Sequence, residues 1–185
     1  MIVFYFTGTG NSLAVAKHIG GDLISIANVA DLKNQSYEDD VIGIVFPIHW
    51  LTVPKIVRRF LGNVQFKANY TFAIGTCGNM PGAAMKSAQK LAQANGNSFN
   101  YTNYLRMLDN YLPLFDVDSE LKKLPGKKVS ENTAIIADDI RHRKHMQVTA
   151  SLGFQLLTGI FNTTVSPEKK AKNYLINNRC NTCGI

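Results

Sequence analysis

The sequence predicts an α/β fold in which helices cover both faces of a five-stranded parallel sheet, making a three-layer sandwich. Five apolar runs alternate with segments of helical period, a pattern typical of parallel strands buried on both faces. The runs lie at residues 2–6, 23–26, 41–46, 70–74 and 99–105. Helix-starting residues follow these runs, and a length of 185 residues suits one domain that buries a core without disulfides.

Marked helix starts follow the first and third apolar runs. Asn11 or Ser12 is expected to cap the first helix, and Thr52 followed by Pro54 to open the second. The expected apolar face of this second helix consists of Ile56, Val57, Phe60 and Leu61.

Three more helices are expected along the rest of the chain. Pro81 opens one that runs through Leu91. Another is capped near Ser130 or Asn132, and its expected buried residues are Ile135, Ile136 and Ile140. The weakly polar residues 148–165 predict a packed or interfacial helix, because polar side chains interrupt the apolar span that a membrane crossing requires.

Composition and charge bound the class of protein. The hydrophobic content of 45% and the charged content of 18% are typical of a soluble globular protein. The first apolar run is too short for a signal peptide and no cationic region precedes it, so a cytoplasmic protein is expected. Despite a formal net charge of +7, no nucleic-acid partner is expected, because the basic residues are scattered. The basic run at residues 141–145 suits the cationic last turn of a helix.

The most informative motif directly follows the first apolar run. It comprises Thr7, Gly8, Thr9, Gly10, Asn11 and Ser12. A strand that leads through such a loop into a helix offers unpaired N–H groups and the positive end of the helix dipole to a phosphate. The loop lacks the third glycine of a dinucleotide fingerprint, since Leu13 stands there, and it lacks the lysine of a triphosphate loop. It suits a phosphomonoester such as flavin mononucleotide (FMN), and an ordinary glycine-rich turn is the alternative.

These residues resemble the flavodoxin signature Thr/Ser-x-Thr-Gly-x-Thr/Ser, whose positions are matched by Thr7, Thr9, Gly10 and Ser12. The predicted order of strands and helices also fits the flavodoxin-like fold. In that fold the ligand lies at the carboxyl ends of the strands, where the strand order reverses. The resemblance therefore implies that the loops after the first, third and fourth strands meet around FMN.

The loop after the third strand is expected to cover the flavin ring. Its residues are Pro47, Ile48, His49 and Trp50. In flavodoxins the corresponding loop covers the isoalloxazine ring, and a backbone group near its tip exchanges hydrogen bonds with flavin N5. Stacking stabilises an aromatic pair by about 0.5–1.5 kcal/mol beyond area burial, so Trp50 is the candidate stacking residue. A surface tryptophan that caps a helix is the alternative, and His49 is expected to be a polar surface group.

The loop after the fourth strand is expected to address the pyrimidine edge of the flavin. Its residues are Thr76, Cys77, Gly78 and Asn79. Glycine lets the backbone approach a ligand closely, and the adjoining N–H groups suit flavin N1 and O2, which become electron-rich on reduction. Small flavodoxins usually carry a stacking tyrosine in this stretch, and Tyr111 is the candidate substitute, with a buried structural role as the alternative. Cys77 is expected to be a small buried residue without chemistry.

A Cys-x-x-Cys-Gly-Ile run occupies residues 180–185. The cysteine pair alone is compatible with half a zinc site or a redox dithiol, but the run matches the start of a bacterial ferredoxin motif, whose next residue is the third cysteine. Cys180 and Cys183 are therefore expected to be ligands of a 4Fe-4S cluster only in a longer parent protein, because two thiolates do not complete the site.

Together with the phosphate loop, the segment 109–111 and the helix end at 140–144, this run resembles a family of flavodoxin and ferredoxin fusion proteins. The resemblance implies a flavodoxin-like FMN domain at residues 1–165, and a linker with the truncated start of a ferredoxin domain at residues 166–185. The implied function is electron transfer between FMN and iron-sulfur clusters. Because most flavodoxins are acidic and this chain is basic, an acidic redox partner is the other implied acceptor.

Two other functions remain open. One is a flavin-dependent oxidoreductase that uses NAD(P)H to reduce a quinone or another small molecule. The other is a flavodoxin-fold binding module that holds no cofactor. In none of these is a particular side chain assigned as a general acid or base.

Overall fold

The five apolar runs form one parallel sheet in a computed structural model of the chain, which describes residues 1–109 and 115–164. Its strands are β1 (Ile2–Tyr5), β2 (Asp22–Ser25), β4 (Val41–Pro47), β6 (Tyr70–Cys77) and β7 (Tyr101–Arg106). They lie in the order β2-β1-β4-β6-β7. When only these five strands are numbered along the chain, the order is 2-1-3-4-5, which is that of the flavodoxin-like fold. The predicted fold class is therefore confirmed.

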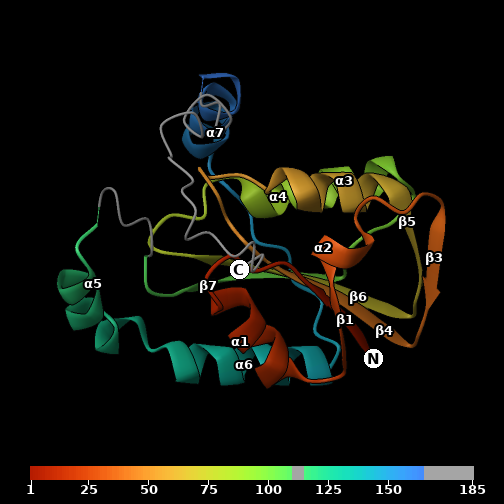
Figure 1. Cartoon of the computed structure of the whole chain (residues 1–185), viewed down its shortest axis with the longest axis horizontal. Helices are drawn as coiled ribbons and strands as arrows, with labels where there is room; N and C mark the ends of the chain where they lie inside the picture. Colours follow the sequence, from red (N-terminus) through yellow and green to blue (C-terminus); the bar gives the residue numbers. More distant parts are fainter. Residues whose placement is uncertain (110–114, 165–185) are drawn as a thin grey trace, which may run out of the picture.

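Helices cover both faces of this sheet (Figure 1). On one face lie α2 (Ile26–Val29), α3 (Lys55–Asn63) and α4 (Ala84–Ala94), and α3 contacts both of the others. On the opposite face α1 (Asn11–Ile19) packs against α6 (Val129–Arg141). The arrangement is the predicted three-layer sandwich.

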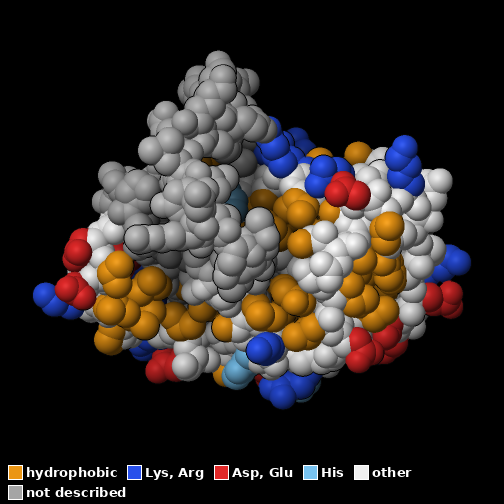
Figure 2. Space-filling view, viewed as in Figure 1, with side chains coloured by type: hydrophobic (Ala, Val, Ile, Leu, Met, Phe, Trp, Pro, Cys, Tyr) orange, Lys and Arg blue, Asp and Glu red, His pale blue; other side chains and the backbone are white. Residues whose placement is uncertain are grey.

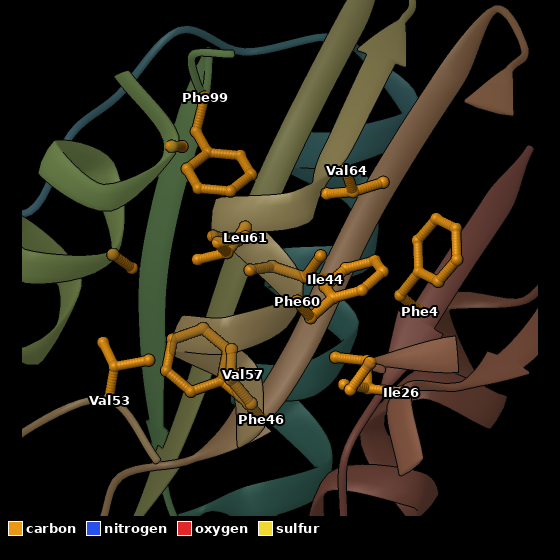
Figure 3. Close-up of a cluster of buried hydrophobic side chains, with 14 of the residues drawn as sticks. Phe4, Ile26, Ile44, Phe46, Val53, Val57, Phe60, Leu61, Val64 and Phe99 are labelled. Atoms are coloured by element: carbon orange, nitrogen blue, oxygen red, sulfur yellow. The ribbon is translucent and has the colours of Figure 1, made fainter. Parts of the chain in front are cut away.

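Two apolar layers fill the space between the sheet and its helices. Ile44 and Val45 of β4 are both fully buried because neighbouring residues of a strand face opposite sides, and both sides of this sheet are covered. The layer under α3, drawn in Figure 3, includes Phe4, Ile44, Phe46, Val57, Phe60 and Leu61. The layer under α1 and α6 includes Val3, Val15, Val45, Ile74, Ile136 and Ile140.

Two short strands and the short helix α2 were not predicted. β3 (Gln35–Glu38) and β5 (Val64–Lys67) pair in parallel as a separate two-stranded sheet. β3 has the sequence Gln-Ser-Tyr-Glu and alternates between half-buried and exposed residues. Such a strand shows neither an apolar run nor an alternation of apolar and polar residue types, so no sequence pattern indicated it.

The predicted starts of three helices were wrong. α1 begins at Asn11 after Gly10, so neither Asn11 nor Ser12 caps it with its side chain. α4 begins at Ala84 rather than at Pro81, because a turn joining the Ala84 N–H to the Pro81 carbonyl precedes the helix. α6 begins after Lys128, ahead of the caps predicted within it.

Two further expectations for the second half of the chain need correction. Ile135 is 57% exposed, because it lies off the stripe of α6 that turns Ile136 and Ile140 toward the sheet. Arg141 ends α6, so the rest of the basic run at 142–145 follows the helix instead of forming its last turn.

Three further elements complete the described fold. α5 (Val117–Lys123) leads into a 3-10 helix, η1 (Pro125–Lys127). α7 (Leu152–Thr164) occupies most of the predicted helix at 148–165, with Thr158 buried and Leu152 and Leu156 exposed. In the described ranges, no helix has the length and apolar character that a membrane crossing needs.

Candidate functional site

The loops that follow β1, β4, β6 and β7 lie together at the carboxyl ends of the strands. The hydroxyl oxygens of Ser12 and Thr76 lie 2.8 Å apart, which joins the first turn of α1 to the end of β6. The Ile48 N–H donates to the Thr76 carbonyl at 2.7 Å. Asn11 Nδ2 donates to the Leu108 carbonyl at 3.1 Å. These bonds assemble the loops at the point between β1 and β4 where the strand order reverses, the usual ligand position in this topology.

The loop of residues 7–12, the expected anion cradle, forms a closed turn beside open space. The Gly10 N–H donates to Thr7 Oγ1 at 3.0 Å and closes the turn. Gly10 has φ of 92°, a left-handed conformation that glycine adopts without a steric penalty. A Cβ atom at Gly8 or Gly10 would meet nothing within 4 Å, so open space adjoins the loop on this side.

The first turn of α1 supplies donors and no negative charge. Its first helical hydrogen bond runs from the Ala14 N–H to the Gly10 carbonyl at 2.9 Å, so the N–H groups of residues 11–13 have no acceptor within the helix. No acidic residue stands in this turn. The Ser12 hydroxyl is buried and bonded to Thr76, so Ser12 can offer an anion its N–H rather than its side chain.

Trp50 lies at the tip of a tight turn between His49 and Thr52. The His49 N–H donates to the Thr52 carbonyl at 3.1 Å and the Thr52 N–H donates back at 2.9 Å. Trp50 and Leu51 have φ of 50° and 63°, the conformation of a type I′ turn, which usually takes asparagine and glycine. Each bulky residue there costs about 1–2 kcal/mol. The Trp50 side chain is 37% exposed.

The residues that precede this turn connect it to the sheet. Pro47 is the last residue of β4, and its neighbour Ile48 is half-buried. The rings of Phe6 and His49 meet edge to face with centroids 6.4 Å apart. Desolvation lowers the pKa of His49 below its ordinary value.

The loop after β6 is held closely by the segment after β7. The Met107 N–H donates to the Cys77 carbonyl at 2.7 Å. A Cβ atom on Gly78 would lie 2.0 Å from Asp109 Oδ2, so a side chain at this position would require Asp109 to move. Burial raises the pKa of the Cys77 thiol to about 11, and the side chain is 8% exposed. Cys77 is therefore a buried protonated thiol at neutral pH, which agrees with its predicted structural character.

Sequence reasoning missed two cations that contact this loop. Lys127 Nζ lies 3.1 Å from the Gly78 carbonyl, and Arg106 Nε donates to the Asn79 carbonyl at 3.1 Å. Lys127 stands 49 positions along the chain from Gly78, in a polar stretch that carries no motif. Its contact depends on the fold, which brings Lys127 of η1 to Met107, the residue that follows β7.

The remaining predicted site residues, Tyr111, Cys180 and Cys183, lie outside the described residues. Within residues 1–109 and 115–164, no group of three or more histidine, cysteine or acidic residues is arranged to hold a metal ion. A polar hollow lined by residues 38–40 and 67–69 lies at the amino ends of β4 and β6, so these loops lie at the opposite ends of the strands.

Comparisons with known proteins give likenesses of fold. No family model matches the chain, and no curated protein does. The two-electron reduced flavodoxin of Megasphaera elsdenii is 19% identical, with a TM-score of 0.38 over 56% of this chain and 85% of the flavodoxin. A protein of Bacteroides uniformis ATCC 8492, provisionally described as a flavoprotein, is 19% identical, with a TM-score of 0.45 over 66% of this chain and 97% of that one. The Trp repressor binding protein of Bacillus subtilis is 11% identical, with a TM-score of 0.43 over 68% and 94% of the two chains.

Proposed function

We propose that the chain binds FMN and acts as an electron-transfer flavoprotein. The observation that carries the proposal is the assembly of three loops at the switch point of a sheet with flavodoxin-like strand order. The hydrogen bonds of Thr76 to Ser12 and to Ile48 join all three. One loop suits a phosphate, one carries a tryptophan, and one offers backbone donors.

The residues present fit a phosphomonoester. The cradle at residues 7–12 combines the positive end of α1 with N–H groups that have no acceptor inside the helix. The open space beside Gly8 and Gly10 leaves room for the ligand, and the absence of an acidic residue from the first turn of α1 avoids charge repulsion. Neutral donors of this kind suit one phosphate group better than a polyphosphate, which usually requires a lysine and magnesium.

The other two loops fit the ring system of FMN. Trp50 would offer an aromatic face, and the strained turn that carries it favours a functional origin, because left-handed backbone at bulky residues persists where function selects it. The loop at Gly78 and Asn79 would offer backbone N–H groups to the pyrimidine edge. When bound, FMN supplies the transfer of electrons singly or in pairs. The chain's own contribution is binding, orientation and electrostatics, and the proposal assigns no side chain as an acid or base.

The physiological partner is proposed to be a ferredoxin domain or another acidic redox protein. The net charge of +7 would attract an acidic partner through long-range steering. Lysine and arginine side chains lie along the edge of the molecule formed by α3 and α4 (Figure 2), where Lys55, Arg59 and Lys90 are exposed. We propose, from the sequence, that the protein is located in the cytoplasm.

The cysteine run would tie the chain to iron-sulfur chemistry in a longer protein. Residues 166–185 are proposed to be a linker and the start of a ferredoxin domain, and Cys180 and Cys183 alone do not supply the four thiolates of a 4Fe-4S cluster. After anaerobic reconstitution, iron and sulfide analysis is expected to find no cluster in this chain and two in a version extended through the ferredoxin. A full cluster in the 185-residue chain, or none in the extended protein, would contradict this assignment.

Reconstitution with FMN tests the proposed function. The purified chain is incubated with FMN, freed of excess ligand, and examined by absorbance spectroscopy and protein quantification. One bound FMN per chain is expected, with no rapid oxidation of added NADPH. A colourless chain would favour a binding module that holds no cofactor. Rapid NADPH oxidation would favour a flavin-dependent oxidoreductase.

A further inference from the structure

Two cations hold successive carbonyl groups of the loop after β6. Lys127 Nζ in η1 lies 3.1 Å from the Gly78 carbonyl oxygen and 2.7 Å from that of Met107. Arg106 Nε, at the end of β7, donates to the Asn79 carbonyl at 3.1 Å. Lys127 therefore bridges the loop after β6 and the segment after β7.

Lys127 is fixed by its own surroundings. Its side chain is 8% exposed, and its third acceptor is Glu120 Oε2 at 3.4 Å. Three acceptors match the three N–H donors of an ammonium group. Glu120 also accepts from Lys123 Nζ at 2.6 Å, and this bond does most to lower the pKa of Glu120, so its carboxylate stays charged beside Lys127. The lysine is thus held between α5 and the loop.

The fixed carbonyls determine where the neighbouring N–H groups point. In a trans peptide the C=O and the following N–H point in opposite directions. Holding the Gly78 and Asn79 carbonyls toward the two cations therefore turns the N–H groups of Asn79 and Met80 away from them. Both residues are exposed, and neither N–H donates a hydrogen bond to another of the described residues.

We propose that Lys127, supported by Arg106, is a positioning residue that presents the Asn79 and Met80 N–H groups to the pyrimidine edge of a bound FMN. Its positive charge also favours the reduced flavin, which is richer in electrons at that edge. This inference rests on the proposed function above. It adds a named pair of side chains that adjust affinity and potential at that same site.

The electrostatics of Cys77 support the inference, because Cys77 ends β6 directly before this loop. Arg106 and Lys127 both act to lower the pKa of Cys77, against the larger opposing effect of burial. Asp109 acts in the opposite direction and is the weakest of these influences. At this thiol the effect of each cation therefore exceeds that of Asp109.

A charge-matched pair of variants tests the proposal. Lys127→Met removes the contact, whereas Lys128→Met removes the same charge from a neighbouring side chain that is 66% exposed and pairs with Glu131. In the FMN-free chain, NMR backbone order parameters of residues 78–80 are expected to fall in Lys127→Met from about 0.85 to below about 0.6. They are expected to stay unchanged in Lys128→Met.

Affinity and potential are then measured with FMN. The Kd for FMN is expected to rise roughly tenfold in Lys127→Met, with the reduced form losing a further tenfold, which lowers the two-electron potential by about 30 mV. Lys128→Met is expected to leave both values unchanged. A purely structural role would change the Kd without moving the potential, and that result would overturn the electrostatic part of the proposal.

The outcomes separate this inference from the proposed function. Failure of the unaltered chain to bind FMN would overturn the proposed function and this inference with it. Normal binding by that chain, with Lys127→Met indistinguishable from Lys128→Met in order parameters, Kd and potential, would overturn this inference alone. If Lys127→Met does not fold, the exposed Arg106 provides a second variant, Arg106→Gln. It is expected to shift Kd and potential in the same directions by a smaller factor, and unchanged values would overturn the proposal.

Discussion

Ser12 and Thr76 share a hydrogen bond of 2.8 Å across 64 positions of the chain. Both are almost completely buried, at 1% and 3% exposure. The bond attaches the first turn of α1 to β6, close to the loop that begins at Gly78. This one hydrogen bond thus positions both the loop of residues 7–12 and the loop after β6. A substitution of Ser12 or Thr76 is therefore expected to affect both loops.

Removing one hydroxyl of this pair leaves the other buried and unsatisfied. Thr76→Val is therefore expected to lower the free energy of unfolding by about 1–3 kcal/mol. The double variant with Ser12→Ala is expected to lose less than the sum of the single changes, because the second substitution removes an already unpaired group. Urea unfolding of the four chains measures the cycle. Additive losses would show that the two hydroxyls are not coupled.

Gly10 is expected to be intolerant of a side chain. Its φ of 92° is left-handed, so Gly10→Ala is expected to lower the free energy of unfolding by about 1–2 kcal/mol and to weaken FMN binding. Gly62→Ala is the matched control, since Gly62 lies in α3 and its Cβ would meet nothing within 4 Å. Gly62→Ala is expected to raise the free energy of unfolding by about 0.5–1 kcal/mol and to leave the FMN affinity unchanged. Chemical unfolding and fluorescence titration distinguish the two, and equal effects at both glycines would contradict the assigned loop.

The turn at Trp50 is expected to lower the stability of the FMN-free chain and to strengthen the binding of FMN. Trp50→Gly relieves left-handed strain, so the free energy of unfolding of the FMN-free chain is expected to stay level or rise, while FMN binding weakens by about 1–3 kcal/mol through lost stacking. Trp50→Phe retains a ring and is expected to keep part of the affinity. Flavin fluorescence is expected to be quenched on binding to the unaltered chain and less so in Trp50→Gly. Unchanged quenching and affinity would place the stacking residue elsewhere.

Cys77 is expected to make the fold sensitive to alkaline pH. Burial raises the pKa of this thiol from its ordinary value of 9.0 to about 11, so on raising the pH the unfolded chain loses the proton first. The stability contributed by the neutral thiol is therefore complete below pH 9 and declines toward pH 11, by at most about 1.4 kcal/mol per pH unit. Urea unfolding between these values is expected to show a steeper decline for the unaltered chain than for Cys77→Ala. Parallel curves would contradict the assigned burial.

The central sheet was predictable because burial on both faces leaves a local signal. Ile44 and Val45 face different helical layers, so each strand reads as a continuous apolar run. β3 lacks this signal because polar residues fill most of its four positions. Helix starts were less predictable, because α1 begins behind a left-handed glycine instead of a side-chain cap.

The candidate site divides in the same way. Loops that directly follow strands could be identified, because the topology places all their starts at one edge of the sheet. The contacts of Lys127 and Arg106 with the loop after β6 could not, since they depend on the placement of η1 and on the side-chain direction at the end of β7. Neither the placement of η1 nor this side-chain direction can be predicted from the spacing of residues in the sequence.

The binding of FMN through its phosphate is the central claim, and titration calorimetry with FMN and riboflavin tests it most directly. In the proposed site, the loop at residues 7–12 would contribute helix-dipole and hydrogen-bond energy only to the phosphate, about 1–3 kcal/mol in total. The chain is therefore expected to bind FMN at least about tenfold more tightly than riboflavin. Equal affinities for the two flavins, or no binding of either, would contradict the account.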